Sequence, residues 1–230
     1  MLTNTRKLLF NAQESKYAVG AFNIYNLEGA AAVIKAAEEE QSPVILQLLP
    51  SALDIGGRPL IAMCLEMARN VVIPAVVHLD HCDSEQILTS CLRWGCSSVM
   101  ADGSELDFVN NVHFTKSIVS AANKVGAGVE AELGKLSGEE DGITVATREA
   151  QLTDPQQATE FVHQTGVAAL AVCIGNVHGT YSDEPNLDFK RLAEIKNRVD
   201  VPLVLHGTSG LPDEMIRMAI DLGVCKFNVN

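Results

Sequence analysis

The sequence contains no uninterrupted apolar run of about 18 residues, the length that marks a membrane-spanning helix. Basic residues are also scarce: 17 lysines and arginines stand against 29 aspartates and glutamates, a formal net charge of −12. Nucleic acids and anionic membranes bind clustered basic side chains, so this balance argues against both partners. An anionic substrate must instead meet a local positive site, supplied by a metal ion or by backbone N–H groups.

The six cysteines include no CxxC pair and are scattered from Cys64 to Cys225. This spacing is typical of reduced thiols and does not fit a disulfide framework. The first residues, MLTNTRK, lack the apolar run and the small-residue cleavage site of a secretory signal. We therefore expect a cytoplasmic protein.

What the sequence does contain is a regular alternation of short apolar segments and longer helix-periodic segments. Strands are predicted at residues 18–23, 44–48, 75–79, 98–101, 128–133, 169–174, 203–205 and 226–229. Helices are predicted between them, at residues 28–40, 58–69, 84–94, 107–125, 154–164, 188–197 and 213–222. Segments such as VILQLL are apolar on both faces, as expected for a parallel sheet covered by helices.

Eight strands in this alternation favour an α/β fold of the (β/α)8 TIM-barrel type, for which about 250 residues is typical. A doubly wound sheet is the alternative, but it normally has a glycine-rich turn after its first strand, where this sequence reads NIYNLEG. No linker or repeat divides the chain, so residues 1–230 are predicted to form one barrel domain. Because no helix follows the eighth strand, we expect a truncated barrel that lacks its final helix and any C-terminal helices.

Polar side chains gather where the predicted strands end. The motifs are HLDH (78–81), EAE (130–132), NVHG (176–179), HGTSG (206–210) and NVN (228–230). In a TIM barrel these strand ends share one face, and active sites are built on that face.

Three histidines, His81, His178 and His206, follow the third, sixth and seventh strands. A single histidine is more often structural than a ligand, and His113 and His163 fall within predicted helices. Three converging imidazoles without a cysteine partner, however, are typical of a catalytic Zn²⁺ site with an open fourth position.

Several carboxylates accompany these histidines. Asp80 is a candidate proton donor or acceptor, or alternatively the group that orients a ligating imidazole. Glu130 and Glu132 share one face of the fifth strand, and a cation nearby would offset the cost of burying a carboxylate. Glu140 lies in a long polar segment, 134–153, and is either an acid on a lid or part of a solvated charge run.

Glycine and hydroxyl residues follow the last three strands, among them Gly179, Gly207 and Ser209, with Asn228 nearby. Loops after strands seven and eight commonly bind phosphate in TIM barrels through close backbone N–H groups. The HGTSG motif is a weak signal alone and becomes informative beside two candidate metal ligands.

Taken together, these segments resemble the class II, metal-dependent ketose-bisphosphate aldolases, and among them most closely the tagatose-bisphosphate type. The resemblance covers nearly the whole chain. It rests on AFNIYNLE, SPVILQ, HLDHC, SVMADGS, VEAELG, GEEDG, NVHGTY, PLVLHGTSG and LGVCKFNVN. It implies that His81, His178 and His206 bind zinc and that Glu132 holds a second cation or an alternative zinc position.

The resemblance also implies the catalytic and substrate-binding residues. Asp80 would exchange a proton with the aldehyde oxygen, and Glu140 would take the proton from dihydroxyacetone phosphate. A monovalent cation (Na⁺ or K⁺) is expected nearby. The residues implied to bind the phosphate are Gly179, Gly207, Thr208, Ser209, Asn228 and Asn230.

The implied reaction is the reversible aldol cleavage of a ketose 1,6-bisphosphate through an enediolate that zinc stabilises. No lysine Schiff base is required, so neither Lys135 nor Lys226 has a role in it. A homo-oligomer, dimer or tetramer, is expected.

The alternative to an aldolase is a non-catalytic or assembly module of a larger catabolic polypeptide. It is considered because the chain ends early and carries Leu49 and Thr208 where relatives have smaller residues. A metal-dependent hydrolase barrel is less favoured, since such barrels usually place an HxH pair where this sequence reads Phe22-Asn-Ile.

Overall fold

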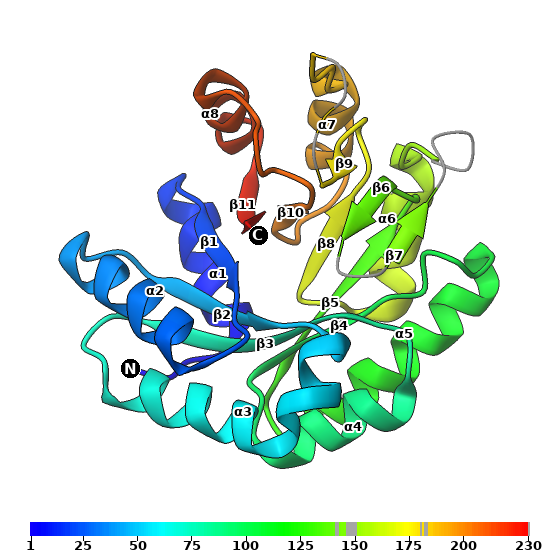
Figure 1. Cartoon of the computed structure of the whole chain (residues 1–230). Coiled ribbons are helices and arrows are strands. Elements are labelled where there is room, and N and C mark those ends of the chain that lie inside the picture. The colour runs from blue at the N-terminus through cyan, green and yellow to red at the C-terminus, as the bar shows by residue number, and fades with distance from the viewer. Residues whose placement is uncertain (141–142, 146–150, 180, 182–183, 230) are drawn as a thin grey trace.

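A computed structural model describes residues 1–140, 143–145, 151–179, 181 and 184–229, with the backbone alone for 137–140 and 143–145. The barrel strands are β1 (Val19–Asn23), β2 (Val44–Leu48), β3 (Ala75–Cys82), β4 (Ser98–Ala101), β5 (Gly128–Leu133), β8 (Ala169–Val172), β10 (Leu203–Leu205) and β11 (Val224–Val229). They are all parallel and close in the order β1-β11-β10-β8-β5-β4-β3-β2 (Figure 1). The prediction of a TIM barrel is confirmed, whereas the single-domain organisation stays a prediction.

Helices form a ring outside the strands (Figure 1). They are α2 (Leu27–Glu39), α3 (Pro50–Asn70), α4 (Glu85–Trp94), α5 (Phe108–Asn123), α6 (Pro155–Thr165), α7 (Phe189–Lys196) and α8 (Asp213–Asp221). The helix predicted at 58–69 in fact begins at Pro50, because a kink at Gly57, with φ 52° and ψ −153°, joins two helical segments. None of the helices in the described part of the chain is long and apolar enough to cross a membrane.

One helix, α1 (Thr5–Ser15), was not predicted from the sequence. The side chain of Asn4 accepts a hydrogen bond from the Lys7 N–H and so begins the helix. Leu8 and Leu9 then pack against inward-facing apolar residues near the first positions of the strands. This helix therefore closes the N-terminal end of the barrel interior, and a substrate must enter from the opposite end.

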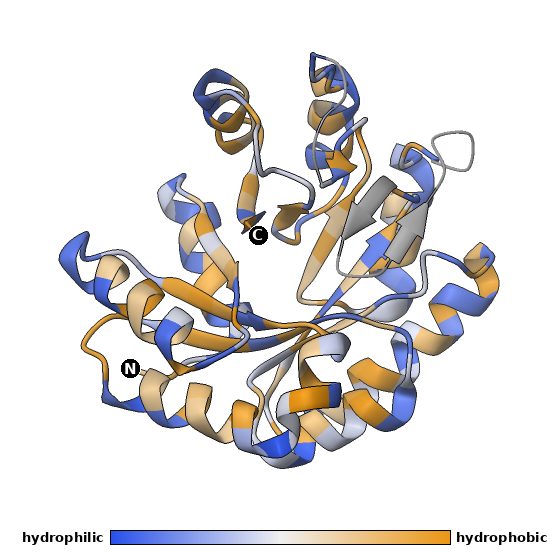
Figure 2. Ribbon diagram, in the orientation of Figure 1, coloured by the Kyte–Doolittle hydropathy of each residue, from blue (hydrophilic) through white to orange (hydrophobic). Residues whose placement is uncertain are grey.

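The apolar core has two parts. One fills the N-terminal half of the barrel interior, and the other lies between the strands and the outer helices. Every residue of β2 and β3 is buried, and the barrel strands are mostly hydrophobic while the outer helix faces are mixed with polar residues (Figure 2). The C-terminal half of the interior is different, because it buries polar and charged side chains. They include Gln47, His78, Asp80, Ser98, Glu130, Glu132, His206, Lys226 and Asn228.

The segment between β5 and α6 carries two further strands, β6 (Ser137–Glu140) and β7 (Ile143–Val145), which pair antiparallel. Strand β6 also pairs in parallel with β9 (Val177–His178), which gives a small three-stranded sheet beside the barrel (Figure 1). At the base of the segment, Lys135 and Gln151 exchange two backbone hydrogen bonds of 2.9 Å. The segment thus leaves the barrel and returns to it at neighbouring points.

Candidate active site

The three histidines that the sequence predicted to converge do lie together at the C-terminal end of the barrel. One nitrogen of each lies within 4.8 Å of the others. His206 Nδ1 is 2.8 Å from His81 Nε2, and the rings of His81 and His178 have centroids 5.0 Å apart. Three imidazole nitrogens at this spacing form a donor set of the kind that binds Zn²⁺.

His81 owes its position to an irregularity in β3. Its φ of 40° lies in the left-handed region, and the pairing register with β4 shifts between Leu79 and Cys82. In a regular strand Asp80 and His81 would point to opposite faces. The shift brings both side chains into the buried site, and strained backbone of this kind is characteristic of functional positions.

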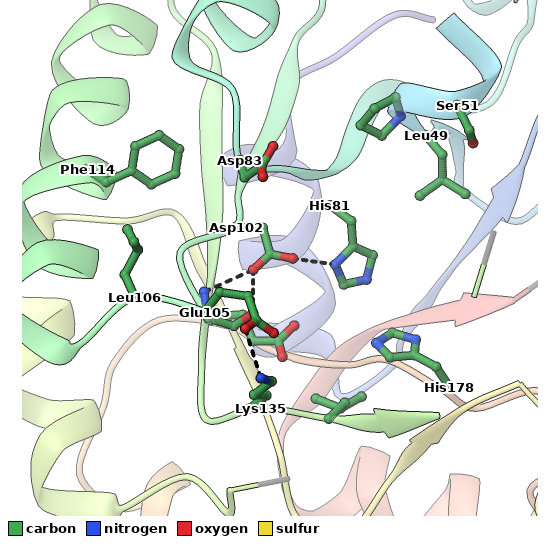
Figure 3. A pocket seen from close by; sticks show the side chains of 14 residues that line it. Leu49, Ser51, His81, Asp83, Asp102, Glu105, Leu106, Phe114, Lys135 and His178 are labelled. Atoms are coloured by element: carbon green, nitrogen blue, oxygen red, sulfur yellow. Dashed lines mark hydrogen bonds and ion pairs between the residues drawn. The ribbon is translucent and has the colours of Figure 1, made fainter. Parts of the chain in front are cut away.

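Asp102, which directly follows β4, orients the His81 ring. Its Oδ2 lies 2.7 Å from His81 Nδ1, while its Oδ1 accepts hydrogen bonds from the N–H and the hydroxyl of Ser104 (Figure 3). Burial alone would raise the pKa of Asp102, but these contacts and the charge of His81 lower it to about 2. An ionised Asp102 accepts the Nδ1–H of His81, so the lone pair of Nε2 faces the other histidines.

Glu130 does the same for His206, since its Oε1 lies 2.9 Å from His206 Nε2. The lone pairs of His206 Nδ1 and His81 Nε2 are thereby directed at each other across 2.8 Å. Such an arrangement is repulsive unless a proton or a metal ion lies between the two atoms. Burial alone would lower the pKa of His81, yet Asp80 and Asp102 raise it to about 10, which marks a place that favours a positive charge.

Glu132 adds a carboxylate to this group. Its Oε2 is buried and has no hydrogen-bond partner among the described residues. Ligand atoms of Glu132, His81 and Asp102 also lie within 4.8 Å of one another. Burial, and next the charge of Asp102, raise the pKa of Glu132 well above its usual value, so a cation here would relieve an unfavourable contact.

Asp80 lies fully buried beside the histidines. Its Oδ2 accepts a 2.9 Å hydrogen bond from Asn228 and lies 3.8 Å from His81 Nε2, and its Oδ1 is 3.2 Å from His78 Nε2. Burial would raise its pKa, but His81, Lys226 and His206 together hold the pKa well below its usual value. Asp80 is therefore ionised.

A buried lysine, Lys226, underlies the cluster and was not among the predicted site residues. Its Nζ lies 2.9 Å and 3.1 Å from the two oxygens of Glu130 and 3.8 Å from Asp80 Oδ1. Burial alone would raise the pKa of Glu130, but the charge of Lys226, together with His206 and His78, lowers it to about 2. The two-residue spacing between Lys226 and Asn228, both inward-facing, is the sequence signal that would have found it.

The glycine-containing loops after β9 and β10 lie against each other. Gly207 has a φ of 60°, and a Cβ at this position would lie 2.2 Å from the carbonyl oxygen of Val177, so only glycine fits. Tyr181, also not predicted, ties the loops together: its hydroxyl donates to the Gly207 carbonyl (2.8 Å) and accepts from the Val177 N–H (3.2 Å). Gly179, with a φ of 78°, lies in the first of these loops.

The other predicted phosphate residues have varied surroundings. Thr208 donates its hydroxyl to the Asn228 carbonyl (2.6 Å), and the Asn228 amide lies 2.9 Å from both Asp80 Oδ2 and His206 Nδ1. Ser209 lies in the loop after β10. Asn230 and the side chain of Glu140 fall outside the described residues. The phosphate-binding roles of this group stay predictions.

A pocket of about 440 Å³ opens beside His81 and His178. One side carries polar groups, including the ion pair of Lys135 Nζ with Glu105 Oε2 at 2.8 Å, and Leu49, Leu106 and Phe114 supply apolar walls (Figure 3). The pocket is of the size that small ligands occupy.

The sequence and the fold both match known proteins. Residues 3–230 match the family model "Fructose-bisphosphate aldolase class-II". The YdjI aldolase from Escherichia coli K12 has a similar structure, with a TM-score of 0.90 and 38% identity, over 100% of this chain and 81% of that one. A provisionally assigned fructose-1,6-bisphosphate aldolase from Coccidioides immitis gives a TM-score of 0.92 and 35% identity over 99% of this chain and 81% of its own.

A more distant structure, the fructose-bisphosphate aldolase (Fba) from Campylobacter jejuni, shares the fold with a TM-score of 0.80 at 22% identity, over 99% of this chain and 77% of that one. The family model spans nearly the whole chain and includes every strand that carries a candidate site residue. The chain therefore belongs to the class II fructose-bisphosphate aldolase family.

Proposed function

We propose that the protein is a zinc-dependent aldolase that reversibly cleaves a ketose 1,6-bisphosphate, of the fructose or tagatose type, to dihydroxyacetone phosphate and an aldehyde. The observation that carries the proposal is the convergence of His81, His178 and His206 beside an ionised Asp80 in a class II aldolase barrel. The tagatose type is the more specific part of the proposal and comes from the sequence resemblance.

The residues fit a zinc ion. His81, His178 and His206 would hold it, because carboxylates set the tautomers of two of these rings so that lone pairs meet. Glu132, with a buried oxygen that lacks a partner among the described residues, would hold an alternative zinc position or a second cation. A bound zinc ion supplies Lewis-acid stabilisation of the negative charge that develops beside the ketone when the carbon–carbon bond breaks.

Asp80 is the proposed acid–base group for the aldehyde half. In the cleavage direction its carboxylate takes the proton from the hydroxyl on the carbon that becomes the aldehyde, and the carbon–carbon bond then breaks with its electrons on the ketone half. In the condensation direction Asp80 returns that proton. The low pKa of Asp80 and its hydrogen bond from Asn228 keep it ionised and oriented for the first of these steps.

Glu140 is the proposed acid–base group for the ketone half, which it protonates during cleavage and deprotonates during condensation. Glu140 is the last residue of β6, a strand that pairs with β9 through Gly138 and His178, and this pairing supports the proposal. The phosphate would be received by backbone N–H groups of the loops after β9 and β10 and at the end of β11, where strand ends in TIM barrels commonly bind phosphate. The residues proposed for it are Gly179, Gly207, Thr208, Ser209, Asn228 and Asn230.

Metal removal tests the proposal. The protein should cleave fructose or tagatose 1,6-bisphosphate as purified, lose this activity after exhaustive treatment with EDTA, and regain it with Zn²⁺. A His178→Ala variant should stay inactive after zinc addition. Cleavage that survives complete zinc removal would contradict the proposal, and comparison of kcat/KM for the two sugars would decide the type. The monovalent cation and the homo-oligomeric state stay predictions.

A further inference from the structure

We infer that Glu130 is a positioning residue that fixes which nitrogen of His206 faces the metal site, and that the Lys226 ammonium holds Glu130 in the required place. The inference rests on the proposed function, because it takes His206 to be a metal ligand. It assigns a role to an ion pair that the aldol reaction itself does not use.

The three side chains form a continuous chain of contacts across the barrel interior. Lys226 Nζ lies 2.9 Å from Glu130 Oε2 and 3.1 Å from Oε1, and Oε1 lies 2.9 Å from His206 Nε2. All three side chains have 0% solvent exposure. Water therefore cannot replace any of these partners, and the orientation of each group depends on the next.

A carboxylate at position 130 can only accept hydrogen bonds, so it requires a proton on His206 Nε2. The other ring nitrogen, Nδ1, is then left with its lone pair, and it is Nδ1 that lies 2.8 Å from His81 Nε2. The ammonium contacts both carboxylate oxygens, which prevents Glu130 from turning away from the ring. Groups that orient metal-binding histidines in this manner typically alter metal affinity by about 10- to 100-fold when they are changed.

The Glu130→Gln variant tests the role of the carboxylate with almost no change in shape. An amide would place an N–H group against the Lys226 ammonium in either orientation, because Nζ lies within 3.1 Å of both oxygens. The amide must turn away, and His206 loses its acceptor. We expect the dissociation constant for zinc, measured by competition with a chromogenic chelator, to rise by about 10- to 100-fold.

The double variant Glu130→Gln/Lys226→Met gives the sharper result. Without the ammonium, the amide oxygen is free to accept from His206 Nε2, so the double variant should bind zinc more tightly than Glu130→Gln alone. An ion pair with a purely structural role predicts no such recovery. The matched control is Ser98→Ala, which removes the 2.6 Å contact to His78 in the same buried cluster and should leave zinc affinity within about twofold.

A spectroscopic measurement on the unaltered protein completes the test if a variant does not fold. In metal-free protein, ¹⁵N chemical shifts of His206 should show a protonated Nε2 and an unprotonated Nδ1. The opposite tautomer would overturn the inference, as would wild-type zinc affinity in Glu130→Gln or absence of recovery in the double variant. If unaltered protein shows the expected tautomer but binds no zinc, the proposed function itself fails.

Discussion

His81 Nε2 and His206 Nδ1 lie 2.8 Å apart, and each ring is held from its far side by a carboxylate, Asp102 for His81 and Glu130 for His206. The two carboxylates come from neighbouring strands, because Asp102 directly follows β4 and Glu130 lies within β5. Their combined effect is to aim two lone pairs at one point, which prepares the site for a cation before the cation arrives.

Zinc should stabilise the folded protein. A ligand that binds only the folded state adds about 4 kcal/mol to the free energy of unfolding when its concentration is about 1,000 times its dissociation constant. We expect the melting temperature of EDTA-treated protein to rise on addition of zinc. In the His206→Ala variant zinc should produce little change, and an equal rise there would show that the ion binds elsewhere.

The Asp102→Asn variant should weaken zinc binding. The amide can turn its oxygen or its N–H₂ toward His81 Nδ1, so the ring loses its fixed tautomer, and we expect about 10- to 100-fold lower affinity. Zinc titration of the folded variant measures this. The matched control is Asp107→Asn, a change of the same kind at the start of the next helix, which should bind zinc as the unaltered protein does.

Asp102 should also make the metal-free protein sensitive to acid. Its pKa is about 2 in the folded state, against 3.8 for an unperturbed aspartate, so the ionised form stabilises the fold. This contribution is complete above about pH 4 and is lost as the pH falls toward 2; it amounts to about 2 kcal/mol. Chemical denaturation between pH 6 and 2 should show a shallower decline for Asp102→Asn. An identical decline in both proteins would contradict the expectation.

Tyr181→Phe should affect substrate binding while leaving the metal site intact. The change removes two hydrogen bonds, to the Gly207 carbonyl and from the Val177 N–H, that tie together the proposed phosphate loops. At about 0.5–1.5 kcal/mol for each bond, we expect KM to rise by about tenfold. Zinc content should not change. Tyr17→Phe, near α1 at the closed end of the barrel, is the control and should leave KM unaltered.

The barrel strands were predictable because a parallel strand covered on both faces is apolar throughout, as VILQL in β2 is. Helix α1 was missed because only a narrow buried face, with Leu8, Leu9 and Ala12, meets the barrel, and most of its other residues are polar. The polar strand ends likewise located the three histidines. Strand β2 was predictable because all of its residues are buried, whereas α1 was not because only part of it is.

The partners of the histidines were harder to predict, because they depend on tertiary contacts. Regular alternation would place Asp80 and His81 on opposite faces, and only the register shift in β3 brings them together. The pairing of His81 with Asp102, and of Glu130 with Lys226, joins different strands, so no local pattern contains it. The sequence therefore predicted the three converging histidines but not the carboxylates paired with His81 and His206.

The pairing of β6 with β9 has a consequence for how this site can vary among relatives. The strand that carries Glu140 and the strand that carries His178 belong to one hydrogen-bonded sheet, with Gly138 opposite His178. A change in the length or register of the segment between β5 and α6 is thus transmitted through the backbone to His178, a proposed metal ligand. We therefore expect a replacement of this segment to keep His178 in position only if it preserves the pairing of β6 with β9.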